Sequence, residues 1–255
     1  MDIVVPIKFA PDLVEELDIA ASGTALDRTC LRLIINEFDD HAIEQALLLK
    51  ERDGGQVTVV APDVEGAEDV LYTAAAKGAD RLIKLTGDFE MGVNNHALAR
   101  ALTAVVNELH PDLVLTGVQA HDDLDGPVGP LLAGYLGMPY LGYVAGVTVS
   151  EGKCIARKEY PGGLTAEMEV GLPAVLGIQA AEKPPRYIIT SLITQAMKTA
   201  QIEESEAGEF DSSGAAAVAR MSRLEAAVHA EMIEGEADQV ADALVALFKE
   251  RGLLA

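Results

Sequence analysis

Short apolar segments alternate with helix-like segments along the first half of the chain, and no other sequence feature constrains the fold as strongly. The apolar segments cover Ile3–Ile7, Val57–Val60, Leu82–Leu85 and Leu113–Leu115. The segments between them have apolar residues at helical spacing and cover Asp39–Arg52, Glu65–Lys77 and Asn95–Leu109. Asn36, with Asp39 three residues later, predicts the N-cap of the first helix. This alternation is typical of βαβ units, so the sequence predicts an α/β domain built on a parallel sheet.

The second half of the chain predicts three further parts. Apolar segments separated by Gly and short turns predict an antiparallel, β-rich extension of the sheet, and they cover Val144–Val149, Cys154–Arg157, Leu164–Val170 and Pro173–Ile178. Residues 203–217 are acidic and poor in apolar side chains, which is the composition of a linker. Residues 218–255 form a C-terminal arm with a predicted helix over Asp238–Arg251, which either folds back or packs on a partner. The α/β domain is therefore expected to occupy residues 1–202.

The charge and composition of the chain exclude several classes of function. Its 255 residues include 41 acidic and 19 basic side chains, and the net charge of −22 would repel a phosphate backbone or an anionic membrane surface. No apolar run approaches the roughly 18 residues that a membrane-spanning helix needs. Cys30 and Cys154 have no zinc-ligand spacing, as is typical of a reducing compartment. We therefore expect a cytoplasmic protein without a nucleic-acid partner, a membrane insertion or a metal site.

One loop contains the most distinctive polar sequence. Residues Gly117–Pro130 follow an apolar strand and place Asp122, Asp123 and Asp125 just before a predicted helix. Parallel sheets bind ligands at this end of their strands, where helix N-termini present free N–H groups. The loop thus predicts a nucleotide site. The three carboxylates are also suited to cap the following helix or, with weaker support, to bind Mg²⁺.

No motif for bond-making chemistry accompanies this loop. The chain has neither the G-x-G-x-x-G nor the P-loop pattern, and it has no Ser-His-Asp, H-E-x-x-H or G-x-S-x-G arrangement. Of the five histidines only His121 lies in the loop. We therefore expect no catalytic residues, and a binding or carrier protein rather than an enzyme.

Eight segments of the chain together resemble the β subunit of electron transfer flavoprotein, and the resemblance extends over nearly the whole chain. In chain order they are Val5–Lys8, Asn36–Ala46, Ala76–Arg81, Gly117–Pro130, Pro161–Gly163, Leu172–Leu176, Pro185–Tyr187 and Glu231–Gly235. Each segment alone is a weak signal, but the family has them in the same order. The resemblance implies an adenine nucleotide α-hydrolase-like domain within a heterodimer that carries electrons from a flavin-dependent dehydrogenase to an acceptor.

The resemblance also implies how cofactors are divided between two chains. In the family the α subunit holds the redox-active FAD, whereas the β subunit binds AMP, which has no redox role. The C-terminal arm of β packs on that α subunit. The positions that match the family's nucleotide site are Pro6, Asn36, Glu37, Phe38, Asp39, Ala61, Pro62, Gly117, Val118, Gln119, Ala120, His121, Asp122, Asp123, Leu124, Asp125, Gly126, Pro127 and Val128.

A second implied site is the segment that docks the dehydrogenase. After the segment that matches Pro185–Tyr187, β subunits have a recognition loop with a leucine and then a lysine-rich run. Here the leucine is displaced from the family's position, and Lys198 is nearly alone. Leu192 is the candidate for the docking side chain and Ile189 is the second. The alternative is an ordinary amphipathic helix that begins with a buried leucine.

The loop departs from the family's pattern, and this bears on two alternatives. Electron-bifurcating members bind a second FAD with a D-G-D-T-x-Q type loop, whose last two named positions are Asp125 and Pro127 here. An unpaired carboxylate about 5 Å from a phosphate would oppose binding by roughly 3 kcal/mol at an effective dielectric constant of about 20, and proline lacks an N–H donor. These changes weigh against a second FAD and less strongly against AMP. A stand-alone nucleotide-binding regulator of the stress-protein type shares the topology but has a glycine-rich phosphate loop that is missing here.

Overall fold

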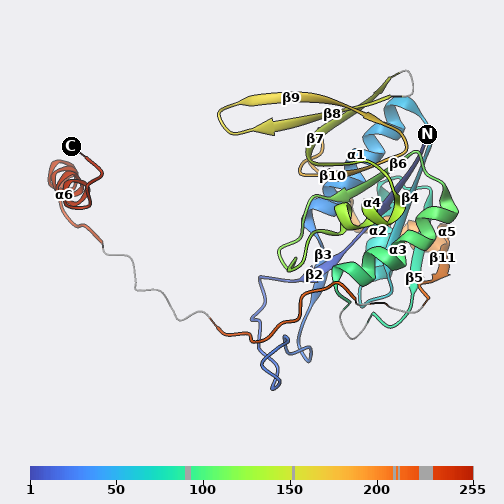
Figure 1. Ribbon diagram of the computed structural model, residues 1–255, viewed down its shortest axis with the longest axis horizontal. Coiled ribbons are helices and arrows are strands. Elements are labelled where there is room, and N and C mark those ends of the chain that lie inside the picture. The colour runs from blue at the N-terminus through green and yellow to red at the C-terminus, as the bar shows by residue number, and fades with distance from the viewer. Residues whose placement is uncertain (90–92, 151–152, 209–210, 212, 224–231, 255) are drawn as a thin grey trace.

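One nine-stranded sheet runs through the part of the chain that the structure describes (Figure 1). The computed structural model describes residues 1–89, 93–150, 153–208, 211, 213–223 and 232–254. In sheet order the strands are β11 (Ile202–Glu206), β5 (Arg81–Thr86), β4 (Gln56–Pro62), β1 (Asp2–Pro6), β6 (Leu113–Gly117), β10 (Ala174–Ile178), β7 (Tyr140–Ser150), β8 (Lys153–Tyr160) and β9 (Leu164–Gly171). The predicted α/β fold on a mostly parallel sheet is confirmed.

Helices cover both faces of the sheet because its central strands are apolar on both sides. The helices are α1 (Glu37–Asp53), α2 (Ala67–Lys77), α3 (Asn95–Leu109), α4 (Val128–Leu136) and α5 (Thr190–Thr199). In β1, Val5 packs in a core cluster with residues of α1 and α2, whereas Val4 packs in a second cluster with residues of α3 and α4. The predicted helices agree with the observed ones to within two residues, and α3 has the predicted bounds.

The strand order places a crevice beside β1. From β1 the chain moves outward to β4 and then β5, and it returns to the opposite side of β1 to form β6. Helices leave the sheet in opposite directions at such a reversal, so the carboxyl ends of the neighbouring strands open into a crevice. A separate antiparallel pair, β2 (Phe9–Pro11) and β3 (Leu33–Ile35), follows β1 at this end of the sheet.

The antiparallel extension is confirmed for three of its four expected segments. Strand β7 pairs with β8 and β8 pairs with β9, both antiparallel, and the turn expected at 151–153 lies mostly outside the described residues. The expectation for Pro173–Ile178 is wrong, because β10 lies inside the sheet and is parallel to both β6 and β7. All five residues of β10 are buried, and a continuously apolar strand is typical of a parallel position between two helix layers.

The start of the expected linker is also corrected. Strand β11 pairs in parallel with β5, so residues 203–206 belong to the sheet rather than to a linker. Its acidic side chains face outward, where Arg81 forms an ion pair of 2.8 Å with Glu203 and Lys84 one of 3.4 Å with Glu204. An edge strand whose exposed residues are acidic has the same composition as a linker. This explains why residues 203–206 were expected to belong to one.

The C-terminal helix α6 (Ala237–Glu250) has no buried residue. In Figure 1 it lies apart from the sheet, and four of its large apolar side chains are 37–43% exposed: Leu244, Val245, Leu247 and Phe248. Of the segment that resembles the family's arm, Glu231 lies outside the described residues. No helix among the described residues is long and apolar enough to cross a bilayer.

Candidate functional site

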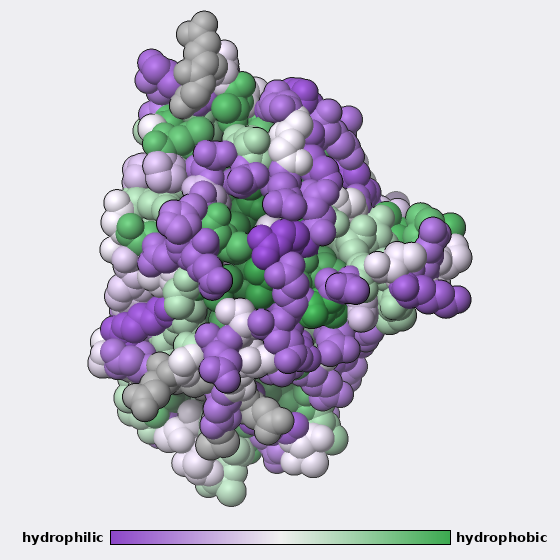
Figure 2. Space-filling model, turned by 90° about the vertical axis from the view of Figure 1, so that its right-hand side faces the viewer, coloured by the Kyte–Doolittle hydropathy of each residue, from purple (hydrophilic) through white to green (hydrophobic). Residues whose placement is uncertain are grey.

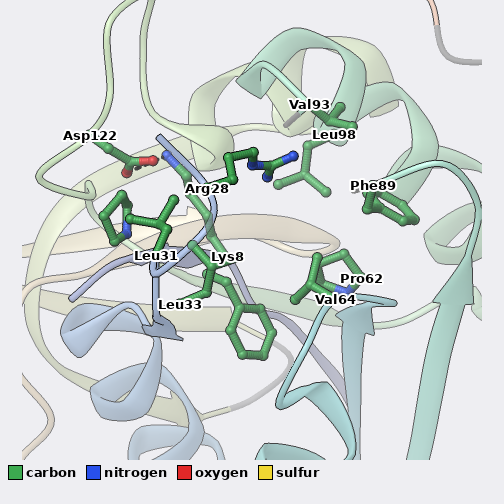
Figure 3. Close-up of a pocket in the computed structure, with 12 residues that line it drawn as sticks. Lys8, Arg28, Leu31, Leu33, Pro62, Val64, Phe89, Val93, Leu98 and Asp122 are labelled. Carbon is green, nitrogen blue, oxygen red and sulfur yellow. Dashed lines mark hydrogen bonds and ion pairs between the residues drawn. The ribbon is translucent and has the colours of Figure 1, made fainter. Parts of the chain in front are cut away.

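A cavity opens at the carboxyl ends of the central strands (Figure 3). It measures about 200 Å³, and its mostly apolar wall includes Leu31, Leu33, Pro62, Val64, Phe89 and Leu98. A second cavity of about 360 Å³ shares Lys8, Arg28 and Asp122 with the first and extends along the loop after β6. We call the first the inner cavity and the second the outer cavity. Together they fall within the roughly 300–1,000 Å³ that is typical of small-molecule sites.

Asp39 joins the ends of two central strands. Its buried carboxylate accepts hydrogen bonds from the backbone N–H of Lys8, at 2.9 Å, and from that of Gly117. Asn36 Nδ2 donates to Asp39 at 3.2 Å and to the carbonyl oxygen of Gln119 at 2.9 Å. Asn36 stands at the N-cap position of α1, but its side chain makes no capping hydrogen bond. The predicted N-cap position is therefore confirmed, but both polar side chains hold the strand ends instead of capping the helix.

Burial raises the pKa of Asp39 to about 6, although its three hydrogen bonds act in the opposite direction. A raised folded-state pKa means that the folded protein binds the proton more tightly than the unfolded chain. The stability that this proton contributes is fully present below pH 3.8 and is lost as the pH rises through 6.

The free energy of unfolding of Asp39→Asn is therefore expected to differ from that of the wild type in a pH-dependent way. Between pH 4 and pH 7 the wild-type value should fall by up to about 3 kcal/mol relative to the variant, because Asn does not titrate. Urea unfolding at several pH values measures this difference. A difference that is constant across the range would show that Asp39 titrates normally.

Two glycines permit the path of the loop after β6. A Cβ on Gly117 would lie 2.7 Å from Asn36 Nδ2 and from Asp39 Oδ1, and 2.8 Å from Phe38 Cβ. Gly126 has φ of 108°, a left-handed value that side chains rarely adopt. The first glycine allows close approach to α1, and the second allows the loop to turn back into α4.

The three carboxylates of the loop all have partners within the protein. Lys8 Nζ lies 2.7 Å from Asp122 and 2.8 Å from Asp123. Asp123 also accepts hydrogen bonds from the backbone of Ala120 and from Asn95 Nδ2. Asp125 accepts one at 3.2 Å from the backbone N–H of Ala216.

These contacts decide between the interpretations of the acidic cluster. The N-cap position of α4 is Pro127, and no side chain caps this helix, so the capping alternative is wrong. Among the described residues no group of three His, Cys, Asp or Glu side chains could hold a metal ion. The cluster instead fixes the shape of the loop, with Lys8 as its main counterion.

The structure brings only part of the expected nucleotide-site residues to the cavities. Pro62 and Asp122 line the inner cavity, and Asp122, Leu124 and Asp125 line the outer one. Asn36, Asp39 and Gly117 support the loop from behind. Among the other expected residues, Ala61 and Val118 are buried in the strand ends, whereas Glu37, Gln119 and His121 are exposed. Lys8, Arg28 and Asn95 were not predicted, although Lys8 lies only two positions beyond Pro6.

Residues 211 and 213–223, which we call the return segment, form part of the wall of the outer cavity. Ala216, Val218 and Met221 line that cavity. Arg100 of α3 donates to the carbonyl oxygens of Asp211, at 2.6 Å, and Ser213, at 2.9 Å. At the far end the N–H of Met221 donates to Gly23 at 2.7 Å, and Arg223 pairs with Glu16 and Asp18. The return segment is therefore attached to the domain near both of its ends.

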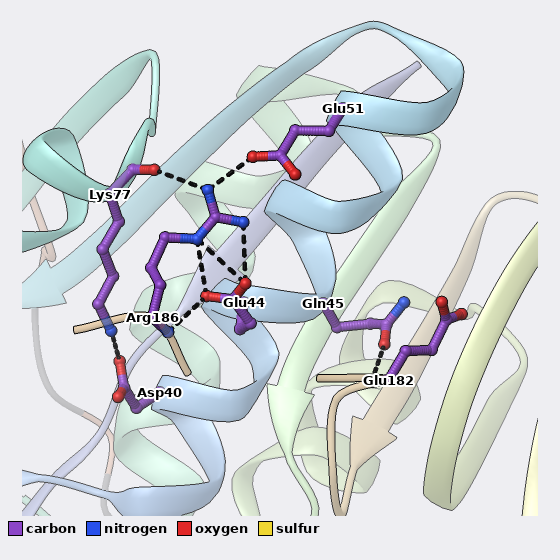
Figure 4. Close-up of polar contacts among 7 residues, drawn as sticks. All are labelled: Asp40, Glu44, Gln45, Glu51, Lys77, Glu182 and Arg186. Atoms are coloured by element: carbon purple, nitrogen blue, oxygen red, sulfur yellow. Dashed lines mark hydrogen bonds and ion pairs between the residues drawn. The ribbon is translucent and has the colours of Figure 1, made fainter. Parts of the chain in front are cut away.

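A second polar network attaches the chain after β10 to α1 (Figure 4). The Glu44 carboxylate is 3% exposed and accepts hydrogen bonds from the backbone N–H of Arg186, at 3.0 Å, and from its guanidinium, at 2.8–3.0 Å. The guanidinium also contacts Glu51 at 2.6 Å. These hydrogen bonds, first to Glu44 and then to Glu51, raise the pKa of Arg186 above its usual range. Glu182 is bound through its backbone N–H, which donates to Gln45 at 3.0 Å.

The segment that follows Arg186 exposes a row of large apolar side chains. Tyr187 is 86% exposed, Ile189 is 54% exposed, and Leu192 in the first turn of α5 is 43% exposed. The alternative of a helix that begins with a buried leucine is therefore wrong, although the helix itself is present. Figure 2 shows the side of the molecule where α5 and β11 lie in Figure 1, and there hydrophobic areas form small patches between hydrophilic side chains.

Comparison with known proteins gives a consistent result. Residues 25–210 match the electron transfer flavoprotein domain. The chain is 32% identical over 261 residues to the electron transfer flavoprotein subunit beta of Methylophilus methylotrophus, with 98% of each chain covered. It is 35% identical over 188 residues to that of Clostridium acetobutylicum, covering 74% of this chain and 72% of the relative. It is also 37% identical over 158 residues to that of Syntrophomonas wolfei, covering 62% of each.

Proposed function

Because the chain belongs to the electron transfer flavoprotein family as a relative of its β subunits, we propose that it is the β subunit of a heterodimer that carries electrons from a dehydrogenase to an acceptor. The single observation that supports this most strongly is the similarity to a β subunit over 98% of both chains. In this proposal the α subunit holds the FAD that is reduced and reoxidised. The β chain contributes a bound nucleotide and a docking surface, and performs no bond-making chemistry.

The inner and outer cavities are proposed to hold AMP. The inner cavity has an apolar wall in which Pro62, Val64 and Phe89 can contact a flat adenine ring. The outer cavity contains Asn94, Asn95 and the loop carboxylates, which can hydrogen-bond ribose hydroxyl groups. The residues present therefore fit an adenine nucleotide, and the bound nucleotide would connect β1, β4 and the loop after β6.

The arm that contains α6 is proposed to pack on the α subunit. Its apolar side chains find no partner in the described part of this chain, since none of the helix residues is buried. An amphipathic helix of this kind is stabilised when its apolar face is covered. The α subunit is the partner that the family supplies.

Cofactor stoichiometry tests the proposed function. The chain is co-expressed with an α subunit encoded beside it, the complex is purified, and FAD and AMP released by denaturation are quantified. We expect one FAD and one AMP per heterodimer. Two FAD would identify an electron-bifurcating subunit, and failure to form a complex would favour a stand-alone nucleotide-binding regulator.

Leu192→Ala is expected to slow reduction of the complex by its dehydrogenase by about tenfold or more, since a central apolar anchor contributes at least about 2 kcal/mol to a typical interface. The FAD content should not change, because the FAD is proposed to lie in the α subunit and Leu192 lines neither cavity. The rate is measured by following the flavin absorbance after mixing with reduced dehydrogenase. Met197→Ala is the matched control, because Met197 is equally exposed on the same helix at 44%. Equal rates of flavin reduction for Leu192→Ala and Met197→Ala would show that Leu192 is not the docking anchor.

A further inference from the structure

The charged side chains around the two cavities differ in whether they have partners within the protein. Lys8 Nζ contacts two carboxylates, and its side chain is only 11% exposed. Asp122 and Asp123 share that lysine, and Asp125 accepts a hydrogen bond from the return segment. The acidic residues that would be expected to repel an anion are thus each bound to a donor within the protein.

Arg28 differs from these residues. It lines the inner cavity, the outer cavity and a third cavity of about 290 Å³ beside them, which also contains Glu65. Among the described residues its guanidinium has no hydrogen bond or ion pair, and the neighbouring Asp27 binds the hydroxyl and N–H of Thr29 instead. Figure 3 shows the Arg28 side chain extending across the inner cavity toward the side where Leu98 lies.

From this geometry we infer that Arg28 binds the phosphate group of the nucleotide and makes the site selective for a nucleotide over the corresponding nucleoside. A guanidinium presents several N–H donors in one plane and forms paired hydrogen bonds with phosphate oxygens. Arg28 stands where the two cavities meet, so an adenine in the inner cavity leaves the phosphate within reach of this side chain. Lys8 is less suited to this role because its single charge is already shared by Asp122 and Asp123. The inference rests on the proposed nucleotide site.

The inference also explains how an acidic loop can accept an anion. Each carboxylate of the loop has a donor, and an additional cation enters the cavity from a different part of the chain, 94 residues before Asp122 in sequence (122 − 28). Arg28 is the one cation of the described cavity linings without a partner, and it adds a single positive charge, whereas a phosphate monoester carries about −1.5 to −2 and each further phosphate adds more. The site therefore favours a monophosphate over a longer chain of phosphates.

The inference is tested by isothermal titration calorimetry. The full chain is first freed of co-purified nucleotide, and its affinities for AMP and for adenosine are then measured. Arg28→Ala should weaken AMP about 10- to 100-fold, as expected for loss of hydrogen bonds to a charged group, and should leave adenosine within about twofold. Arg28→Lys should bind AMP with an affinity between those of the wild type and Arg28→Ala, since lysine keeps the charge but cannot form the paired hydrogen bonds of a guanidinium. Arg32→Ala is the control, because Arg32 makes the same charge change four residues away, pairs with Asp12 at 3.8 Å and lines none of the three cavities.

Different outcomes overturn different claims. If Arg28→Ala weakens both ligands equally or neither, or if Arg32→Ala weakens AMP as much, Arg28 does not bind the phosphate. If the wild type binds adenosine as tightly as AMP, the inference fails while the nucleotide site stands. If the wild type binds neither ligand, the nucleotide site itself is absent and the inference falls with it.

Discussion

Replacing Arg186 by alanine is expected to lower the free energy of unfolding by about 3–5 kcal/mol, the typical effect of removing one partner from a buried ion pair. The Glu44 carboxylate is almost completely buried, and Arg186 supplies its charged partner through three guanidinium contacts. Without the guanidinium, Glu44 keeps only the backbone N–H of residue 186 as a donor. Chemical unfolding at neutral pH measures the loss.

Two further variants separate this effect from a general loss of charge. Glu51→Gln removes the other carboxylate that Arg186 contacts, but Glu51 is 57% exposed, so the change should be within about 1 kcal/mol. The double variant Glu44→Gln/Arg186→Ala removes the buried charge together with its partner and should recover part of the stability. If Arg186→Ala proves no more harmful than Glu51→Gln, the buried pair does not stabilise the fold.

Loss of this pair should also affect function. The backbone of Arg186 is tied to α1 directly before the exposed residues Tyr187, Ile189 and Leu192. Conservative replacement by Arg186→Lys keeps a positive charge but cannot reproduce the forked contact with Glu44. We expect Arg186→Lys to slow reduction by the dehydrogenase more than Met197→Ala does, because the proposed docking segment begins directly after a residue that has lost its guanidinium contacts with α1.

Gly117→Ala is expected to abolish nucleotide binding and to destabilise the fold by roughly 1–3 kcal/mol, the usual range for an added carbon in a close-packed site. The new Cβ would approach Asn36, Asp39 and Phe38 to within 2.8 Å. The start of α1 and the end of β6 would then have to separate, and the hydrogen bond between the Gly117 N–H and Asp39 would be lost. The AMP content of the purified complex and its unfolding free energy are the two measurements.

Gly134→Ala provides the matched control. Gly134 lies inside α4, and a Cβ there would meet no atom within 4 Å. Alanine in a helix is favoured over glycine by about 0.5–1 kcal/mol, so this variant should be as stable as the wild type or slightly more stable. A Gly117→Ala protein that keeps both its AMP and its stability would show that the loop can move away from α1.

The sheet and its helices could be predicted because the signals are local. Apolar residues at helical or strand spacing define α1, α2, α3 and the central strands from a few neighbouring positions. The same local signal failed for β10 and β11. A short, fully apolar segment is compatible with either strand direction, and an acidic edge strand has the composition of a linker.

The polar contacts of the site could not be predicted from sequence because their partners are far apart in the chain. Asp39 binds Lys8 over 31 positions and Gly117 over 78, and Lys8 binds Asp122 over 114. Pairings of this kind depend on the strand order, which no local pattern specifies. The resemblance to a family pointed to the loop after β6, but it did not show that each of its carboxylates has a hydrogen-bond donor within the protein.

The two outer strands of the sheet bear on how the protein behaves at high concentration. An outer strand has unpaired backbone N–H and C=O groups that can continue the sheet into another molecule. Here one border carries Glu203, Glu204 and Glu206, of which the first two form ion pairs with β5, and the opposite border carries Glu167 and Glu169, of which the second pairs with β8. Charged side chains along an outer strand disfavour pairing with a strand of another copy, so both borders of the sheet are protected against fibre-like growth.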